Sequence, residues 1–267
     1  MLTFLFWNIR KKQSAHLVAA LAHEHDVNIV LLAECQDPPR VGLALTPEGA
    51  SRAYNYYPSK KIQVFSRLPR NSLVELDQNN SYLDFWQLEP PHGQQILLVA
   101  VHLPDRYNTP TDHERYRKSR EFIAEIQQHE RKIEHRRTVI VGDFNMNPYE
   151  VGMFAADGFN ALSSRTKVEN RRQRRTSGMP HFFYNPMWNH LGDVQYPPGT
   201  YYFEGKPTEL DWHTLDQVLV RPDLLDSFES AHVKIVTKAG DEDLINHLGR
   251  PNKDISDHLP ILFKLDL

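Results

Sequence analysis

The most informative stretch of the chain is Val139-Ile140-Val141-Gly142-Asp143-Phe144-Asn145, residues 139–145. Its first three residues form a short β-branched apolar run, which is typical of a strand. Asp143 and Asn145 follow that run across a glycine. Taken alone, they also fit an ordinary turn, because Asp and Asn side chains hydrogen-bond to their own backbone. Whether Asp143 and Asn145 form a turn or belong to a functional site therefore depends on the pattern in the rest of the chain.

The same arrangement, a polar side chain at the end of an apolar run, recurs along the sequence. The further instances are Asn8 after 2–7, Glu34 after 29–33, His102 after 96–101, Asp216 before 218–220, and Asp257 with His258 before 259–263. Strand ends cluster at the rim of a sheet, where a rigid scaffold commonly presents functional groups. Considered alone, Glu34 could cap a turn, and His102 could be a histidine at the edge of a sheet with its hydrogen bonds satisfied. Jointly, four carboxylates, two histidines and two amides favour one shared site.

The apolar runs are strand-length, and they predict a mixed α/β architecture. Several strands follow one another from Tyr54 to Val101, whereas helical patterns interrupt elsewhere, notably over about 112–135. This order fits neither strict βαβ alternation nor an all-β plan. Continuous apolar runs such as Ile96 to Val101 indicate strands covered on both faces. We therefore predict two mixed β-sheets packed face to face with helices outside, as a single domain spanning residues 1–267.

Composition excludes several other classes of protein. Hydrophobic residues make up 40% and charged residues 24% of the 267 positions, which excludes global disorder. The single cysteine, Cys35, excludes an internal disulfide and a CxxC zinc site, and suits a reducing compartment. The longest apolar runs have six residues, against roughly 20 needed to span a bilayer. The N-terminus does not read as a secretory signal, so we expect a cytoplasmic protein with no membrane partner.

One basic segment stands out against a net charge of −3. Between Arg165 and Arg175, six basic residues accompany one acid, Glu169, in a segment that we expect to be irregular over 163–180. An aromatic stretch, 181–188, follows at once. The basic side chains could hold phosphates and the aromatics could stack on bases, although a solvated loop and core packing are the ordinary alternatives. The predicted substrate-binding residues here are Arg171, Arg172, Arg174, Arg175, Tyr184 and Asn185.

The polar residues at the strand ends have the chemistry of a metal-assisted hydrolase. Oxygen ligands without cysteine suit Mg²⁺ or Mn²⁺, and Mg²⁺ typically takes one or two carboxylates besides water and substrate oxygens. Hydrolysis of a phosphate ester needs an activated water, a cation on the non-bridging oxygens, and help for the leaving oxygen. The set of carboxylates, amides and histidines supplies each of these parts.

At these residues the chain resembles the endonuclease/exonuclease/phosphatase superfamily, which includes DNase I, exonuclease III-type abasic-site nucleases, neutral sphingomyelinases and inositol polyphosphate 5-phosphatases. The resemblance rests on an ordered series of elements: Trp7-Asn8, Glu34, Val101-His102-Leu103, Gly142-Asp143-Phe144-Asn145, Leu215-Asp216 and Ser256-Asp257-His258-Leu259-Pro260-Ile261. It implies a four-layer, DNase I-like α/β sandwich with the site at one rim of the two sheets. It also implies Mg²⁺ as the cofactor, with Mn²⁺ as a possible substitute.

The resemblance further implies a role for each matching residue. Glu34 corresponds to the principal metal ligand, Asn8 supports the metal and phosphate environment, and Asp257 is a further acid near the metal. Asp143 corresponds to the group that orients or deprotonates water, Asn145 to a phosphate-oxygen contact, and His102 to the leaving-group side. His258 would contact the scissile phosphate, oriented by Asp216. A carboxylate beside an imidazole favours its cationic form, which suits an anionic transition state.

Three positions depart from the pattern of the abasic-site nucleases. These proteins generally carry an acid where this chain has Arg10 and an aromatic residue where it has His102. The usual Gln before the metal-binding Glu is Ala33. Abasic-site repair is therefore less expected. A secreted, DNase I-like role is also disfavoured, because there is no signal sequence and no disulfide pair.

Three functions remain open from the sequence. The first is a Mg²⁺-dependent phosphodiesterase acting on DNA or RNA, which is a nuclease with nucleic acid as its partner. The second is a hydrolase of a small phosphorylated molecule, such as an inositol phosphate or a nucleotide derivative. The third is a non-catalytic binding protein, which is weakened because the proposed catalytic acids are all present. The predicted site residues would contact the phosphate and not the groups attached to it. They therefore do not distinguish a nuclease from a hydrolase of a small phosphorylated molecule.

Overall fold

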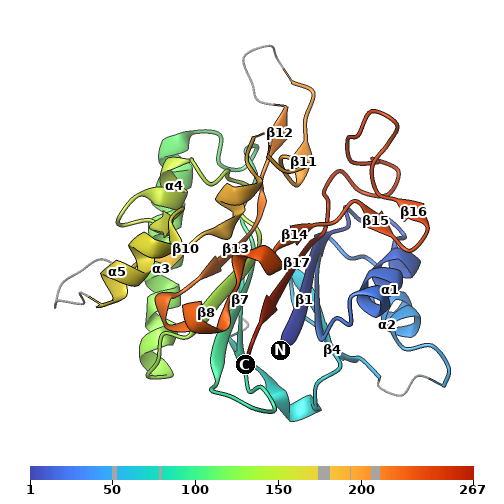
Figure 1. Cartoon of the computed structure of the whole chain (residues 1–267), viewed down its shortest axis with the longest axis horizontal. Helices are drawn as coiled ribbons and strands as arrows, with labels where there is room; N and C mark the ends of the chain where they lie inside the picture. The colour runs from blue at the N-terminus through green and yellow to red at the C-terminus, as the bar shows by residue number, and fades with distance from the viewer. Residues whose placement is uncertain (50–52, 78–79, 174–180, 193, 206–210) are drawn as a thin grey trace.

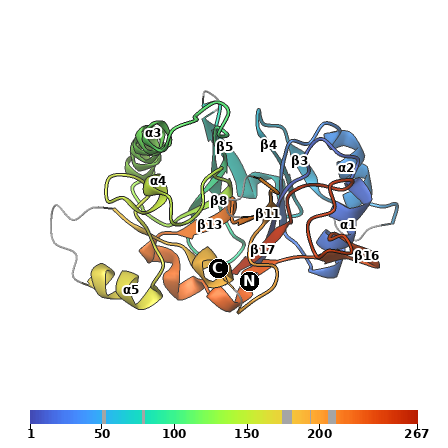
Figure 2. The same ribbon diagram turned by 90° about the horizontal axis from the view of Figure 1, so that it is seen from above.

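The computed structural model describes residues 1–49, 53–77, 80–173, 181–192, 194–205 and 211–267. Two β-sheets lie side by side at the centre, and helices cover their outer faces (Figure 1). The view from above separates α1 and α2 on one side of the pair of sheets from α3 and α4 on the other (Figure 2). These four layers confirm the α/β sandwich predicted from the sequence.

Strand order defines the two large sheets. The six-stranded sheet runs β14 (Lys234–Ile235), β17 (Ile261–Leu265), β1 (Leu2–Asn8), β2 (Ile29–Ala33), β4 (Ile62–Ser66) and β3 (Asn55–Tyr57). The seven-stranded sheet runs β5 (Leu73–Asp77), β6 (Leu83–Leu88), β7 (Ile96–His102), β8 (Thr138–Asp143), β13 (Asp216–Val220), β10 (Phe183–Tyr184) and β9 (Ala161–Leu162). Two short hairpins complete the strands: β11 (Tyr201–Tyr202) with β12 (Trp212–His213), and β15 (Lys238–Ala239) with β16 (Glu242–Asp243).

The helices are few and mostly short. The α-helices are α1 (Ala15–Glu24), α2 (Pro38–Leu45), α3 (Asp112–Lys132), α4 (Val151–Phe154) and α5 (Arg165–Gln173). The 3₁₀ turns are η1 (Arg70–Ser72), η2 (Pro186–His190), η3 (Pro222–Ser227) and η4 (Ser230–His232). The long helix α3 begins with a capping box, in which Thr111 and Glu114 satisfy each other's backbone N–H groups. None of the described helices has the length and apolar character needed to span a bilayer.

Alternation along the central strands explains why the sheets are buried on both faces. In β7, Ile96, Leu98 and Ala100 face the space between the sheets, whereas Leu97, Val99 and Val101 face α3. In β1, the side chains of Phe4 and Phe6 lie between the sheets, and Leu5 and Trp7 pack toward α1. A two-residue period therefore sends every second apolar side chain into a different core. This is the physical reason why these strands read as continuous apolar runs.

The structure corrects one expectation, that residues 163–180 are irregular. Residues 165–173 instead form α5, in which Arg165 and Glu169 make an ion pair at helical spacing, 2.9 Å between Nε and Oε1. Val168 is fully buried, and Arg165 donates a hydrogen bond to the Leu225 carbonyl at 2.7 Å. Docking of this face against η3 stabilises a helix that the local composition does not favour by itself. Residues 174–180 lie outside the described residues.

A buried ion pair links α3 to the end of β13. Arg221 donates two parallel hydrogen bonds to the Glu130 carboxylate, at 2.7 and 3.0 Å, and a third to the Phe182 carbonyl at 3.1 Å. Its guanidinium also lies 3.7 Å from the centre of the Phe183 ring. Both charged groups are almost fully buried. The pair therefore fixes helix α3, the end of β13 and the start of β10 to one another.

We expect Arg221→Met to lower the free energy of unfolding by about 3–5 kcal/mol, because it leaves the Glu130 charge buried without its partner. Urea denaturation measures the loss. The matched control is Arg120→Ala, which breaks an exposed pair with Asp157 and should change stability by at most about 1 kcal/mol. An Arg221→Met variant as stable as the control would contradict the assigned role of the pair.

Candidate active site

Parallel strand pairs bring four of the predicted site residues to one rim. β1 and β2 are parallel, with Asn8 opposite Ala33, so Asn8 and Glu34 lie at the same edge. β7 and β8 are also parallel, with His102 opposite Asp143. The carboxyl ends of parallel strands meet at one edge of a sheet, and the two sheets place these edges together.

Antiparallel strands add the remaining members. β13 begins at Asp216, directly opposite Asp143, and β17 begins just after His258. The loop that carries His258 is fastened to β1: Ser256 donates its hydroxyl to the Asn8 carbonyl at 2.7 Å, and Trp7 donates its indole N–H to the His258 carbonyl at 2.9 Å. Residues at opposite ends of the chain are thereby held at one site.

Gly142 explains why a glycine precedes Asp143. Its φ is +151°, and a Cβ atom at this position would lie 1.9 Å from the Val101 carbonyl oxygen. Any larger residue would push β8 away from β7. Glycine therefore permits the close approach that aligns Asp143 with His102.

The amide of Asn8 bridges two carboxylates. Its Nδ2 donates to Asp143 Oδ2 at 3.2 Å and lies 3.4 Å from Glu34 Oε1, while its Oδ1 accepts the Arg10 N–H at 3.0 Å. Asp143 Oδ1 accepts the Asn145 N–H at 2.9 Å. Within the described part of the chain, neither Glu34 nor Asp143 is paired with a lysine or arginine. This local excess of negative charge suits a divalent cation.

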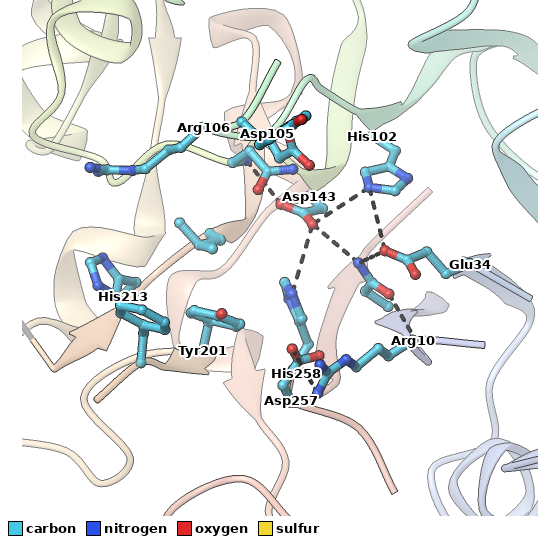
Figure 3. A pocket seen from close by; sticks show the side chains of 15 residues that line it. Arg10, Glu34, His102, Asp105, Arg106, Asp143, Tyr201, His213, Asp257 and His258 are labelled. Carbon is cyan, nitrogen blue, oxygen red and sulfur yellow. Dashed lines mark hydrogen bonds and ion pairs between the residues drawn. The ribbon is translucent and has the colours of Figure 1, made fainter. Parts of the chain in front are cut away.

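Two histidines flank the Asp143 carboxylate (Figure 3). His102 Nε2 and His258 Nε2 each lie 3.9 Å from Asp143 Oδ2, and His102 Nε2 lies at the same distance from Glu34 Oε1. His258 Nδ1 lies 2.8 Å from Asp216 Oδ2, and Asp216 is completely buried. Both histidines therefore point their Nε2 atoms toward the group at the centre of the site.

The environment of His258 favours its cationic form. Burial alone would lower its pKa, but the hydrogen-bonded Asp216 carboxylate and the charges of Asp143 and Asp257 raise the pKa to about 10. At neutral pH the side chain is an imidazolium that can donate from Nε2. Asp143, Asp216 and His258 each offer a ligand atom within 4.8 Å of the others. A protonated imidazole is a hydrogen-bond donor and not a metal ligand, so the Glu34 and Asp143 side of the site fits a metal better.

A cavity of about 540 Å³ encloses this network. The predicted residues that line it are Asn8, Glu34, His102, Asp143, Asn145, Asp257 and His258, and Asp216 lies behind His258. Asn145 points its Nδ2 at the Leu103 carbonyl, 3.0 Å away. Asp257 is ion-paired with Arg10, at 3.2 Å between Oδ2 and Nη1, and not with another member of the predicted metal site.

Two predicted substrate contacts lie in the interior instead. Asn185 is fully buried, where its Nδ2 donates to Gln217 Oε1 at 2.8 Å and its Oδ1 accepts the Met187 N–H at 2.9 Å. Tyr184 is 3% exposed and packs edge-on against the Phe228 ring. Neither side chain presents a surface to a substrate, which corrects the expectation for Tyr184 and Asn185.

The predicted arginine cluster is only partly described. Arg171 lies on α5 with its guanidinium 5.8 Å from the centre of the Phe182 ring, and it does not line the cavity. The side chain of Arg172 and the whole of Arg174 and Arg175 lie outside the described residues. A role for these arginines in substrate binding stays a prediction.

Several cavity residues were not predicted from the sequence as site residues. They are Arg10, Asp105, Arg106, Tyr107, Tyr201, Phe203, His213 and Leu215. The ring of Tyr201 lies 4.9 Å from that of His258, centre to centre. Arg10 could have been found from its position two residues after Asn8. Leu215 directly precedes Asp216 and belongs to the Leu215-Asp216 element of the sequence resemblance. The others come from loops and the β11–β12 hairpin, which carry no strand-end pattern.

Comparisons with known proteins identify the family and the fold. Residues 5–258 match the Endonuclease/Exonuclease/phosphatase family, whereas no curated protein sequence matches the chain. Similar solved structures include an AP endonuclease from Archaeoglobus fulgidus, with 14% identity, a TM-score of 0.55 and 100% of both chains covered. Another is D. rerio TDP2 complexed with single strand DNA product, with 16% identity, a TM-score of 0.55, and 100% of this chain and 99% of that chain covered.

A third similar structure is an endonuclease/exonuclease/phosphatase family protein from Bacteroides thetaiotaomicron, with 15% identity and a TM-score of 0.56, covering 99% of this chain and 97% of that chain. Identities this low support a shared fold, and the family match extends over nearly the whole chain. The chain therefore belongs to the endonuclease/exonuclease/phosphatase family and has its DNase I-like α/β sandwich fold.

Proposed function

We propose that this protein is a divalent-metal-dependent phosphodiesterase that hydrolyses phosphodiester bonds in nucleic acid, with residues 1–267 acting as one catalytic domain. One observation carries the proposal: the Asp143 carboxylate lies 3.9 Å from the Nε2 atoms of two histidines and shares the Asn8 amide with Glu34. A base, a cationic donor and a carboxylate that has no lysine or arginine partner among the described residues thus surround one cavity. This is the set of groups that hydrolysis of a phosphate diester needs.

The donor set fits Mg²⁺, with Mn²⁺ as a substitute. Glu34 and Asp143 offer carboxylate oxygens, which are hard ligands of the kind that Mg²⁺ prefers, and Asn8 turns its Nδ2 toward both of them. Glu34 would be the main protein ligand, because its side chain is partly exposed to the cavity. When bound, the ion would neutralise charge on the phosphate. Asp257 is less suited to this role than expected, since its carboxylate is already paired with Arg10.

The protein side chains divide the proton transfers between them. Asp143, held by the Asn8 amide and the Asn145 N–H, would orient the attacking water and accept its proton. The His258 imidazolium would donate to a non-bridging phosphate oxygen and stabilise the charge that develops there. His102 lies on the other side of Asp143 and would serve the leaving oxygen. Asn145 would add a phosphate contact.

Features at the cavity mouth support nucleic acid as the substrate. Tyr107 is 91% exposed and Phe203 is 43% exposed, and both line the cavity together with Arg106. Exposed aromatic rings near a cation suit unpaired bases and their phosphates. The similarity of the fold to an AP endonuclease and to TDP2 complexed with single strand DNA product also supports a nucleic-acid substrate.

A small phosphorylated molecule is the second candidate substrate. The cavity volume of about 540 Å³ lies within the range of sites that enclose small ligands. An inositol phosphate or a nucleotide derivative would use the same phosphate-directed residues. A nucleic acid and a small phosphorylated molecule differ in the groups that are attached to the phosphate.

A substrate panel tests the proposal. Plasmid DNA, single-stranded DNA, RNA, inositol phosphates and a bis-aryl phosphate are each incubated with Mg²⁺ or Mn²⁺, with and without a chelator. We expect cleavage of a polynucleotide that falls by about 100-fold or more on chelation and in Glu34→Gln, because the ion and its carboxylate ligand are removed. Chelator-resistant cleavage would contradict the metal role. Binding of nucleic acid with no turnover of any substrate would indicate a non-catalytic binding protein instead.

A further inference from the structure

The turn that follows β1 fixes an arginine at the wall of the cavity. Arg10 and Lys11 both have left-handed backbones, with φ of 45° and 59°. The Arg10 N–H donates to Asn8 Oδ1 at 3.0 Å, and the Lys11 N–H donates to the Glu34 carbonyl at 2.9 Å. Non-glycine residues persist in this conformation only where the surroundings enforce it. The turn that carries Arg10 is therefore held by two residues of the proposed site, Asn8 and Glu34.

The side chain of Arg10 is anchored at its other end as well. Its Nη1 lies 3.2 Å from Asp257 Oδ2, and Asp257 directly precedes the fastened His258. Figure 3 shows the Arg10 side chain running below the carboxylates, with its guanidinium beside Asp257 and His258. Nearly half of the side chain, 47%, is still exposed. A guanidinium has five N–H donors, so donors remain for an anion in the cavity.

The position of this cation differs from that of the catalytic network. Among the described residues, Arg10 is ion-paired with Asp257 and with neither Glu34 nor Asp143. Its guanidinium therefore lies beside Asp257 and His258, away from the pair of carboxylates that would hold the metal. In a polynucleotide the next phosphate is one nucleotide away along the chain, whereas an isolated diester has no such group.

We propose that Arg10 binds the phosphate next to the one that is cleaved and that Asp257 positions its guanidinium. The inference rests on the proposed function and adds a substrate class to it: polynucleotides, whose flanking phosphates reach Arg10, are preferred over an isolated diester. Asp257 is then a positioning residue that acts through Arg10.

Matched dinucleotides test the proposal. The kcat/KM of a dinucleotide with a single phosphodiester is compared with those of the same dinucleotide bearing an added 5′- or 3′-terminal phosphate. For the wild-type protein, we expect one of the two added phosphates to raise kcat/KM by about tenfold, in line with a charge-assisted contact. Arg10→Ala should abolish this gain, and Arg10→Lys should keep part of it. Asp257→Asn should reduce the gain, mainly by raising KM.

The matched control is Lys12→Ala, which removes one positive charge from the same turn but does not line the cavity. Lys12→Ala should keep the full increase in kcat/KM that the added phosphate gives in the wild-type protein. Binding of a single-stranded oligonucleotide at several salt concentrations gives a readout that needs no turnover, and Arg10→Ala should lower the salt slope by about one. Thermal unfolding of each variant confirms that the fold is intact.

The outcomes separate this inference from the proposed function. A wild-type protein that cleaves nothing in the presence of metal overturns the nuclease proposal, and the role of Arg10 falls with it. If the wild-type protein cleaves the dinucleotides and Arg10→Ala shows the same increase in kcat/KM from the added phosphate, the inference about Arg10 is wrong but the proposed function stands. Equal losses on all three dinucleotides in Arg10→Ala also overturn it, because the arginine would then serve the scissile phosphate or the fold.

Discussion

Asp143→Asn is expected to reduce phosphodiester turnover by about 10²- to 10⁴-fold, the range associated with losing a general base. The substitution preserves the shape of the side chain, and Oδ1 can still accept the Asn145 N–H. It removes the negative charge that both histidines face and that shares the Asn8 amide with Glu34. The loss should appear mainly in kcat, measured on whichever substrate the panel identifies.

Stability distinguishes this chemical effect from misfolding. Asp143 is buried near the carboxylates of Glu34 and Asp216, which repel its charge. It also lies near the His258 imidazolium and the Asn8 amide, which stabilise that charge, so neutralising it removes opposing contributions. The melting temperature of Asp143→Asn in chelator should therefore stay close to that of the wild-type protein. Added Mg²⁺ should raise it less than in the wild type. Asp157→Asn, an exposed change beyond the cavity, is the control, and near-normal turnover in Asp143→Asn would refute the assignment.

The layers of the fold could be predicted from the sequence, because a strand that is buried on both faces has a recognisable sequence pattern. A strand such as Ile96–His102 has to supply apolar side chains to two different cores, and it therefore reads as an unbroken apolar run. The same logic applied to the site. Asn8, Glu34, His102 and Asp143 each end a parallel strand, and parallel strands that share an edge must bring their ends together.

Other features depended on tertiary contacts that leave no such trace. Aromatic density over 181–188 suggested base stacking, but Tyr184 completes the core between the sheets. The helix α5 forms because Val168 and Arg165 dock onto neighbouring elements. The pairing of Arg10 with Asp257 joins positions far apart in the chain, and it depends on a left-handed turn that nothing in the local sequence announces.

The pocket wall formed by Tyr107, Tyr201 and Phe203 shows the same limit more clearly. Tyr107 lies in a loop, Tyr201 lies in the two-residue strand β11, and Phe203 directly follows that strand. These segments are too short or too irregular to show a two-residue or a helical period. Their inclusion in the cavity follows from where the loops fold over the rim. Sequence patterns therefore predicted the groups that we propose act on the phosphate, whereas the groups that would contact the rest of a substrate became apparent only in the structure.

Asp216→Asn is expected to lower turnover by a factor similar to that of Asp143→Asn, but with a distinctive dependence on pH. Asp216 is fully buried, and its carboxylate holds His258 Nδ1 at 2.8 Å. An amide cannot supply the charge that offsets burial, so the pKa of His258 should fall from about 10 toward or below its ordinary value. At pH 8 the wild-type imidazole is protonated, whereas that of the variant is largely neutral.

The sign of the pH effect follows from this shift. The wild-type protein keeps the His258 cation from acidic pH up to about pH 10, so its contribution to the rate is flat through neutrality and is lost only above that value. In Asp216→Asn the cation forms only as the pH falls through the lowered pKa. The ratio of wild-type to variant kcat/KM should thus be largest near pH 8 to 9 and should narrow toward pH 6. A ratio that stays constant over this interval would mean that Asp216 orients the imidazole without holding its proton, and NMR titration of the His258 ring provides the independent check.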